Sequence, residues 1–440
     1  MDAAPTSFAS LAGTGPERVV LTDVDATADG GAVVVGNFSG QATFGSVTLT
    51  ADPSSTTSIP YADGVVFKVG PSGAVVWVEH LPAGHNSGFL PSTVAVTTTG
   101  DAMVAGSFTG RITLDGTTVD AQETGSDGFA LLLSDSGTMQ WARVTGSGPT
   151  NSTFVATGMA ATPSGGAVIA ARSVGTGVVL GEAGAVQFSQ AFGITADGEI
   201  LWATAIHDDL PNAGRVARTS GGDLVVAGTF PSTNGYSAVR AVKLNSDGVE
   251  QWKETVAADS ARSISVIGLV ATSDGGVAVG LADSRMTSCG LTGSTASLPT
   301  TVRVGADGSC VSYSRTNGVR NTGITRNLGG DTVAVGRQSG SGTNAYVAVG
   351  DSTTATSTPF SSGTAGQADP TAVTVLTDGS IFVVGTLTEQ KSFGSTLLTS
   401  AGATTPPPTG RLHRQARTRR EHRLTRPGLL HAALPETLGW

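Results

Sequence analysis

Apolar and polar residues follow one another along most of this chain in short runs that are separated by tight-turn signals. In SDGFALLLSDSGTMQW (126–141), an Asp-Gly pair, an apolar run and a second turn precede Trp141. The same order ends at Trp77, Trp202 and Trp252, and each tryptophan stands four residues after a turn glycine. Because Asp-Gly and Ser-Gly pairs favour hairpin turns, each copy predicts two antiparallel strands joined by a tight turn.

A second pattern, a turn followed by an apolar run that closes on a small residue, recurs seven times. The closing residues are Gly36, Gly106, Ala171, Gly228, Gly280, Gly336 and Gly385. The runs are apolar at consecutive positions, which is typical of strands buried on both faces. Helical periodicity is absent through this region, so the pattern predicts an all-β fold.

Together the two patterns define a repeat of strand, tight turn, strand, variable loop, strand, tight turn and strand. Four-stranded antiparallel units of this kind are the blades of a β-propeller, and we predict seven blades within residues 1–402. The opening FASLAGTGP (8–16) parallels WARVTGSGP (141–149), with Phe8 at the position of Trp141. The N-terminal segment is therefore expected to be the fourth strand of the last blade, which would remove an exposed sheet edge.

This order of elements resembles the bacterial β-propeller repeat family (SBBP-type repeats) of secreted and surface-anchored proteins. Units there also run from a G-G-x-x-V-x-G strand to a D-x-F-V-A-K-L strand and a G-x-x-x-W strand. The chain departs from the pattern at Ser312, which replaces the tryptophan of unit five, and at 351–358, which have neither turn glycine nor tryptophan. We therefore expect irregular outer strands in units five and six. The resemblance implies an extracytoplasmic location and an interaction role, and it carries no catalytic motif.

Charge is distributed unevenly along the chain. The net charge is −9, but residues 403–440 contain seven arginines and two glutamates, so residues 1–402 are strongly acidic. An acidic body without a basic stripe argues against binding to nucleic acid or to an anionic membrane. No apolar run approaches the ~18 residues of a transmembrane helix, and no signal-peptide pattern opens the chain. The scarcity of lysine agrees with a secreted or surface-anchored protein, which we expect to be a monomer.

The strand order predicts where a ligand would bind. Turns between strands 1–2 and 3–4 fall on one rim, and the long, irregular 2–3 and 4–1 loops, such as 39–61 and 109–125, fall on the other. Because function on rigid scaffolds concentrates in such loops, we expect the second rim to bind an unknown protein or glycan, without cofactor or metal. Two alternatives remain: a glycan hydrolase or lyase with carboxylates at the channel mouth, and a structural repeat protein without a ligand.

Few residues stand out as chemical candidates, because no catalytic signature motif occurs. His80, His85 and His207 are interpreted as solvated loop residues, and the four repeat tryptophans, with Phe8, as structural packing residues. Cys289 and Cys310 lie in one unit and form a disulfide candidate if the compartment is oxidising. Their predicted positions near opposite rims argue against the bond, so the sequence leaves it open.

The last segment, 403–440, breaks the repeat in the middle of unit seven. Three prolines and then the arginine- and histidine-rich stretch stand where a third strand is expected, and proline cannot donate a ladder hydrogen bond. We interpret the segment as a GC-rich gene read out of frame, with a basic tail for an acidic partner as the functional alternative. It is expected to lie outside the fold, disordered or as an isolated helix.

Overall fold

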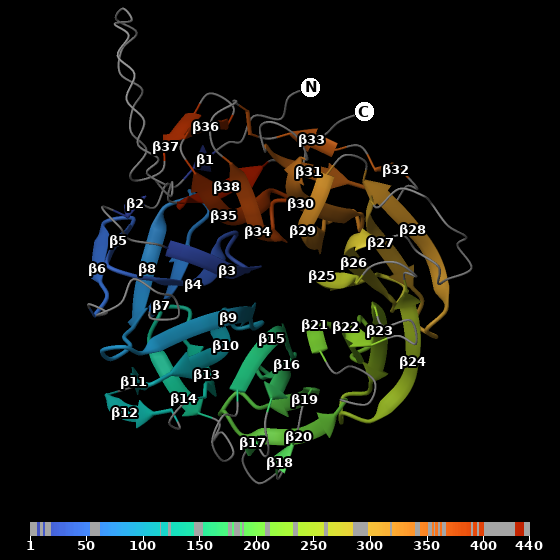
Figure 1. Cartoon of the computed structure of the whole chain (residues 1–440), viewed down its shortest axis with the longest axis horizontal. Helices are drawn as coiled ribbons and strands as arrows, with labels where there is room; N and C mark the ends of the chain where they lie inside the picture. The colour runs from blue at the N-terminus through green and yellow to red at the C-terminus, as the bar shows by residue number, and fades with distance from the viewer. Residues whose placement is uncertain are drawn as a thin grey trace, which may run out of the picture.

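The computed structural model describes residues 7–8, 12–13, 19–52, 62–114, 116–121, 125–144, 153–174, 178–179, 185–186, 189–206, 212–231, 236–258, 263–284, 298–316, 319–338, 344–350, 354–355, 357–359, 361–362, 367–388, 390–393, 396–399 and 427–434. These residues form an all-β ring of antiparallel sheets around a central axis (Figure 1). No helix among them is long and apolar enough to cross a membrane.

Six complete blades follow one another in the described part of the chain. The first consists of β3 (Val19–Ala26), β4 (Ala32–Phe38), β7 (Asp63–Val69) and β8 (Val75–Leu81), and the second of β9 (Gly88–Val96), β10 (Ala102–Thr109), β13 (Asp127–Leu133) and β14 (Met139–Val144). The third has β15 (Thr153–Ala161), β16 (Ala167–Val174), β19 (Ser189–Ile194) and β20 (Ile200–Ala205), and the fourth β21 (Asn212–Arg218), β22 (Leu224–Pro231), β23 (Ser237–Leu244) and β24 (Glu250–Ala257). The fifth has β25 (Ser265–Ala271), β26 (Val277–Ser284), β27 (Leu298–Val304) and β28 (Cys310–Thr316), and the sixth β29 (Val319–Arg326), β30 (Thr332–Gln338), β31 (Ala345–Val349) and β33 (Ser357–Pro359).

The expected count of seven blades is not matched, because only six complete blades are formed from consecutive strands. The seventh repeat unit contributes only β34 (Ala368–Val375) and β35 (Ile381–Thr388) to its sheet. The other two strands come from the chain ends, β38 (Pro427–Leu434) and β1 (Ser7–Phe8), in the order β1-β38-β35-β34. The N-terminal strand therefore holds the fourth position, but its neighbour is β38 and not a strand of the repeat.

The expectation that the whole segment 403–440 lies outside the fold is also corrected by β38. Its eight residues pair along β35 from Thr388↔Pro427 to Ile381↔Leu434. Proline is tolerated there because it is the first residue of the strand. The physical reason for the pairing is the open edge of β35, whose backbone groups need partners. Residues 401–426 and 435–440 lie outside the described part.

A β-bulge in every inner strand explains the recurring small residue of the second strand. In β3 the register skips Thr22, and the preceding Leu21 pairs with Gly36. A Cβ built on Gly36 would lie 2.3 Å from the Val20 oxygen, and one on Gly106 would lie 2.2 Å from the Leu90 oxygen. The bulge brings the inner strand so close that only a very small residue fits. Unit five departs from this, because Leu281 takes the equivalent position and Gly280 precedes it.

Hydroxyl groups at the bulges tie neighbouring blades together. The three bonds are Thr22 Oγ1 to Pro91 O (2.8 Å), Ser92 Oγ to Ala156 O (2.7 Å) and Thr371 Oγ1 to Leu21 O (3.0 Å). Each acceptor is the residue immediately before the bulge of the next inner strand. The last bond joins residues 350 positions apart and closes the ring between β34 and β3.

The apolar core lies between adjacent sheets. One cluster joins Val34 and Phe67 of the first blade to Phe382 and Val384 of β35. Similar clusters fill the spaces between the first and second blades and between the second and third. Because each sheet is buried on both faces, the second and third strands are apolar at consecutive positions, as in the fully buried pattern of β13.

Four of the long 2–3 loops contain regular structure in their described residues, which corrects the expectation of irregular loops there. They carry hairpins: β5 (Gln41–Phe44) with β6 (Val47–Thr50), β11 (Arg111–Leu114) with β12 (Thr117–Asp120), β17 (Val178–Val179) with β18 (Ala185–Val186), and β36 (Gln390–Phe393) with β37 (Thr396–Thr399). An additional strand, β2 (Ala12–Gly13), pairs with β5. Buried and exposed residues alternate along β5 and β11, which keeps one face of each of these two strands on the core.

The outer strands of units five and six depart from the repeat in different ways. β28 is regular and seven residues long in spite of Ser312, and β32 (Thr354–Ala355) adds to its outer edge in parallel. The outer strand of the sixth blade, β33, has only three residues. Irregularity is therefore found in unit six, where both turn and tryptophan are missing, and not in the backbone of β28.

Candidate functional site

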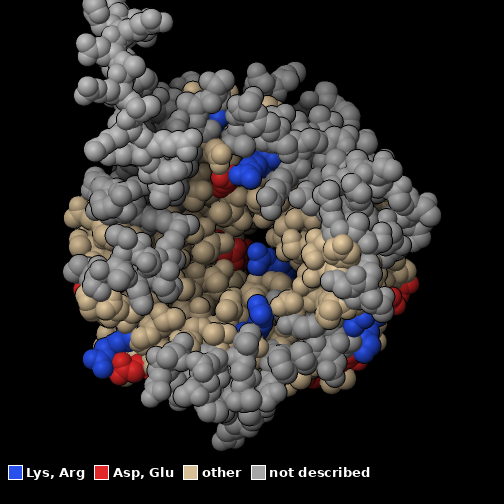
Figure 2. Space-filling view, viewed as in Figure 1, with Lys and Arg blue, Asp and Glu red and all other residues tan. Residues whose placement is uncertain are grey.

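The centre of the ring is a polar cavity of about 220 Å³. It is lined by seven inner strands, β3, β9, β15, β21, β25, β29 and β34. Figure 2 shows the centre of one face hollowed, with acidic and basic side chains close to the hollow. Three charged residues line this channel: Asp23, Asp25 and Arg215.

Asp23 connects the first two blades. Its Oδ1 accepts the Val24 N–H (3.0 Å), and its Oδ2 accepts the Thr93 hydroxyl (3.0 Å) and the Val94 N–H (3.1 Å) of β9. Although it is partly accessible from the channel, the surrounding strands remove most bulk water. This burial raises the pKa of Asp23, and the positive charge of Arg215 opposes the rise more than any other group.

Asp25 repeats this arrangement two residues further along β3. Its Oδ1 accepts the Ala26 N–H (2.9 Å) and its Oδ2 accepts the Val96 N–H (2.8 Å). Burial raises the pKa of Asp25 to about 6, the negative charge of Asp23 contributes further, and the two N–H donors lower it. The channel wall on β3 therefore carries two carboxyl groups that protonate more easily than ordinary aspartates.

Arg215 occupies the position in the fourth blade that Asp23 occupies in the first. Each is the first residue after the bulge of its inner strand, on β21 and β3 respectively. Arg215 donates through Nη1 to the Thr157 oxygen (2.6 Å) and, at 3.3 Å, to the Gly214 oxygen. The remaining donors of the guanidinium have no hydrogen-bond partner within the described part of the chain.

The four tryptophans lie between blades on the rim of tight turns. Their indole N–H groups donate to the next blade's 3–4 turn: Trp77 to Asp135 O (2.9 Å), Trp141 to Ala196 O (2.5 Å), Trp202 to Ser246 O (3.0 Å) and Trp252 to Ala306 O (2.9 Å). The indole ring lies against that turn's glycine, as Trp77 does against Gly137. Trp141 is 9% exposed and the others are partly buried. Each tryptophan thus contacts a turn one repeat ahead.

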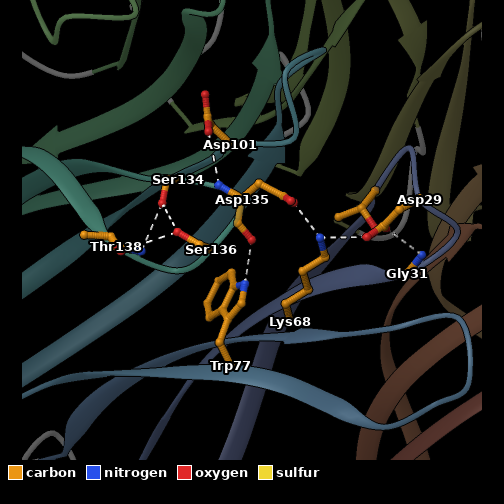
Figure 3. A network of polar contacts seen from close by, with 10 residues as sticks. Asp29, Gly31, Lys68, Trp77, Asp101, Ser134, Asp135, Ser136 and Thr138 are labelled. Carbon is orange, nitrogen blue, oxygen red and sulfur yellow. Dashed lines mark hydrogen bonds and ion pairs between the residues drawn. The ribbon is translucent and has the colours of Figure 1, made fainter.

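An ion-pair network accompanies the first of these contacts (Figure 3). Lys68 of β7 is 3% exposed, and its Nζ lies 2.8 Å from Asp29 Oδ2 in its own blade and 2.5 Å from Asp135 Oδ1 in the next. The Lys68 hydrogen bond is the main cause that lowers the pKa of Asp29 to about 2. Lys243 repeats the ion pair within its own blade, 2.9 Å from Asp223, and contacts the next blade through a hydrogen bond to the Ala306 oxygen (3.1 Å). Pairing across blades makes this a structural feature of the turn rim.

The remaining candidates from the sequence are placed separately. His80 lies on strand β8 and not in a loop, and its Nε2 is 2.6 Å from Oδ2 of the buried Asp63. The reason is that β8 extends to Leu81. His85 lies in the 4–1 loop, and His207 and Cys289 lie outside the described residues. Cys310 begins β28 and is not free. Because Cys289 is not described, the pairing of these two cysteines stays a prediction.

Phe8 lies in β1, where it pairs with Ala432 of β38. Across the described part of the chain, no group of three or more His, Cys, Asp or Glu side chains is placed to hold a metal ion.

The hairpin side of the ring offers a second candidate surface. In β11, Ile112 and Leu114 are buried and Arg111 and Thr113 are exposed, and in β5 Ala42 and Phe44 are buried in the same way. The β11–β12 hairpin is fixed to the preceding 4–1 connection by the Gly84 N–H, which donates to the Arg111 oxygen (2.7 Å). The buried side chains of β5 and β11 therefore hold each hairpin against the core, and the opposite face of each hairpin points outward.

These features define the chain as an all-β β-propeller. No family model matches the chain, and no curated protein matches it. Among solved structures, a protein of unknown function from Dyadobacter fermentans is 12% identical, covers 98% of both chains and has a TM-score of 0.44. The Dos1 propeller is 9% identical (88% of this chain, 94% of the other; TM-score 0.44). A puromycin hydrolase mutant complexed with PGG is 12% identical (88% and 54%; TM-score 0.50). At these identities the similarity concerns the fold alone.

Sequence reasoning missed the channel residues. The signal was present in TDVDA (22–26), where aspartates at alternate positions of the strand share one face. Arg215 had no comparable signal, because its position opposite Asp23 depends on ring closure. The partners of Lys68 were also invisible, since Asp135 lies 67 residues away.

Proposed function

We propose that this chain is a non-catalytic, extracytoplasmic binding module that uses its hairpin face to hold a protein or glycan partner. The observation that carries the proposal is the hairpin repeated in the first two blades, in which the inward side chains of β5 and β11 are buried and the outward ones are more exposed. A rigid scaffold that presents polar faces from successive blades is suited to recognition of an extended surface.

The exposed faces of the first two hairpins are both polar. Thr43 and Thr48 form a cross-strand hydroxyl pair (2.9 Å) on the first. Arg111 and Asp120 form a bidentate ion pair on the second, with Nε–Oδ1 at 2.7 Å and Nη2–Oδ2 at 3.1 Å. Ion pairs this exposed add little stability, which favours a role in recognition. Hydroxyl and guanidinium donors on flat hairpins suit carbonyl, hydroxyl or carboxylate acceptors of a partner.

The proposal is tested with a surface variant that leaves the anchored face intact. Arg111→Ala, Thr113→Ala and Thr118→Ala are combined, and the matched control combines Val249→Ala and Leu328→Ala, which are exposed on the turn rim. Protein and glycan arrays are probed with the whole chain and with both variants. We expect a partner that the hairpin variant no longer binds and the control still binds, at unchanged melting temperature. Equal binding by all three proteins would overturn the proposal.

One observation favours the enzyme alternative. Asp23 and Asp25 bring two carboxyl groups with raised pKa values into the channel, and a general acid needs such a group. Both carboxylates, however, accept backbone N–H groups of β9, which is the arrangement of an inter-blade tie. Hydrolysis or elimination of a glycan that is abolished by Asp25→Asn would replace the binding proposal with this alternative.

We also propose that the sheet β1-β38-β35-β34 acts as a seventh blade. The ring-closing bond between Thr371 and Leu21 and the packing of Phe382 against the first blade support this role. In this arrangement β38 and β1 complete one sheet, so the outer edge of β35 is not left unpaired.

A further inference from the structure

One level of the channel combines opposite charges with open space. The residues that follow the seven bulges are Asp23, Thr93, Gly158, Arg215, Gly268, Gly323 and Ala372. Four of the seven are glycine or alanine, so the walls between Asp23 and Arg215 recede at this level. All seven line the same cavity of about 220 Å³.

Hydrogen-bond accounting leaves acceptor capacity on the acidic wall. Two carboxylates offer about eight lone-pair sites. Asp23 uses three of its sites and Asp25 uses two, all on N–H or hydroxyl donors of β3 and β9. About three sites therefore remain, which matches the three N–H donors of an ammonium group.

The opposite wall retains donors. A guanidinium has about five N–H donors, and only those of Nη1 on Arg215 are engaged, by Thr157 and Gly214. The Nε and Nη2 donors form the edge that binds a carboxylate through two parallel hydrogen bonds. This edge has no hydrogen-bond partner within the described residues.

We propose that the central channel binds a small zwitterion, an amino acid whose ammonium group lies against Asp23 and Asp25 and whose carboxylate lies against Arg215. The cavity is smaller than the ~300 Å³ at which sites for drug-sized ligands begin, and it has room for far more than the ~15 Å³ that one water needs. Met159, Leu269 and Val373, on β15, β25 and β34, also line the cavity and add apolar surface between the charged groups. This site is independent of the hairpin face.

The chemistry predicts a pH dependence. The titratable or charged groups that line the cavity in the described part of the chain are Asp23, Asp25 and Arg215. An ammonium group is held by ionised carboxylates, and Asp25 becomes protonated near pH 6. Affinity should therefore fall as the pH is lowered from 8 to 5.

The test uses the whole chain and isothermal titration with glycine, 4-aminobutanoate and 6-aminohexanoate. Propylamine and propanoate, which have one charge each, are the matched ligands. We expect at least one amino acid to bind with a Kd of ~1 mM or tighter, and both single-charge ligands to bind at least ~10-fold more weakly. The series also measures the separation of the two charged walls. Absence of binding by all three amino acids at ~50 mM would overturn the proposal, as would equal binding of propylamine.

Variants locate the site. Arg215→Lys keeps the charge and removes the bidentate edge, and it should weaken binding at least ~10-fold, as should Asp25→Asn. Arg218→Met, three residues further along β21, and Asp197→Asn on the exposed β19–β20 turn should bind as the parent does. If Asp25→Asn does not fold, the ligand series and Arg215→Lys still decide. Unchanged affinity in Arg215→Lys would place the ligand elsewhere.

Discussion

The indole nitrogen of Trp77 donates a 2.9 Å hydrogen bond to the main-chain oxygen of Asp135, a residue 58 positions later and one blade further round the ring. The same contact recurs from Trp141, Trp202 and Trp252 to the following blades. The repeated tryptophan is thus a contact between units. Unit five has Ser312 in place of this tryptophan, and unit six lacks the turn glycine against which the indole ring would lie.

Removal of one indole N–H should loosen two blades. We expect Trp141→Phe to lower the free energy of unfolding by about 1–3 kcal/mol, because the bond to Ala196 and part of the packed ring are lost. Leu201→Ala, at a side chain 67% exposed, is the control and should change it by less than about 0.5 kcal/mol. Urea unfolding measures both, and equal effects would contradict the inter-blade role.

The glycine under the indole can be tested in the same way. Gly137 has φ +84° and a Cβ there would lie 2.6 Å from the Trp77 ring, whereas Gly116 has φ +70° and open space around it. Gly116→Ala should cost about 1 kcal/mol through backbone strain alone. Gly137→Ala should cost about 2 kcal/mol more, because the ring must move. Equal decreases in the free energy of unfolding of the two variants would show that the Trp77 ring can move away from position 137 at little cost.

Asp25 should make the fold less stable as the pH rises. Its folded-state pKa of about 6 is above the ordinary 3.8, so its stabilising effect is complete below pH ~4 and is lost as the pH rises through 6. The difference is at most about 3 kcal/mol, since one pKa unit corresponds to about 1.4 kcal/mol. Asp25→Asn should reduce the pH dependence of the free energy of unfolding between pH 4 and 7. Asp197→Asn should keep the pH dependence of the parent protein.

Lys68 should shape stability at acid pH. The pKa of Asp29 is lowered to about 2, so the stability of this pair is present above pH ~4 and is lost as the pH falls through 2. In Lys68→Met, the free energy of unfolding should therefore fall less as the pH is lowered from about 4 to 2. At pH 7 its effect should be small, about 1 kcal/mol or less, because the two aspartates are exposed and water can solvate them. Unfolding free energies measured from pH 5 to 2 test this prediction. The same pH dependence in the parent and in Lys68→Met would contradict a stabilising role of the ion pair.

Shortening the chain tests whether the C-terminal segment is part of the fold. If β38 completes the sheet of β35, a chain shortened to residues 1–400 should unfold at a lower temperature, because β1 and β35 both lose their partner. If the segment lies outside the fold, the shortened and full chains should have the same melting temperature. Calorimetry of both chains distinguishes these results.

Local pattern was sufficient to predict the four-stranded grouping of the six complete blades. Consecutive apolar residues in DGFALLL required burial on both faces, and the turn glycines, such as Gly137 with φ +84°, required positive φ. These are properties of single strands and turns, so they can be inferred without knowledge of neighbours. The hairpins at 41–50 and 111–120 were missed because their strands are only four residues long.

The sequence by itself determined an all-β repeat, because the spacing of apolar runs, turns and small residues repeats whatever the blades contact. Only the tertiary structure decided which strands complete the last sheet, since β1 and β38 come from opposite chain ends and their pairing depends on an edge left open by β35. It alone also placed Asp23 opposite Arg215. Ring closure sets which inner strands face each other across the channel, and no local pattern encodes that distance.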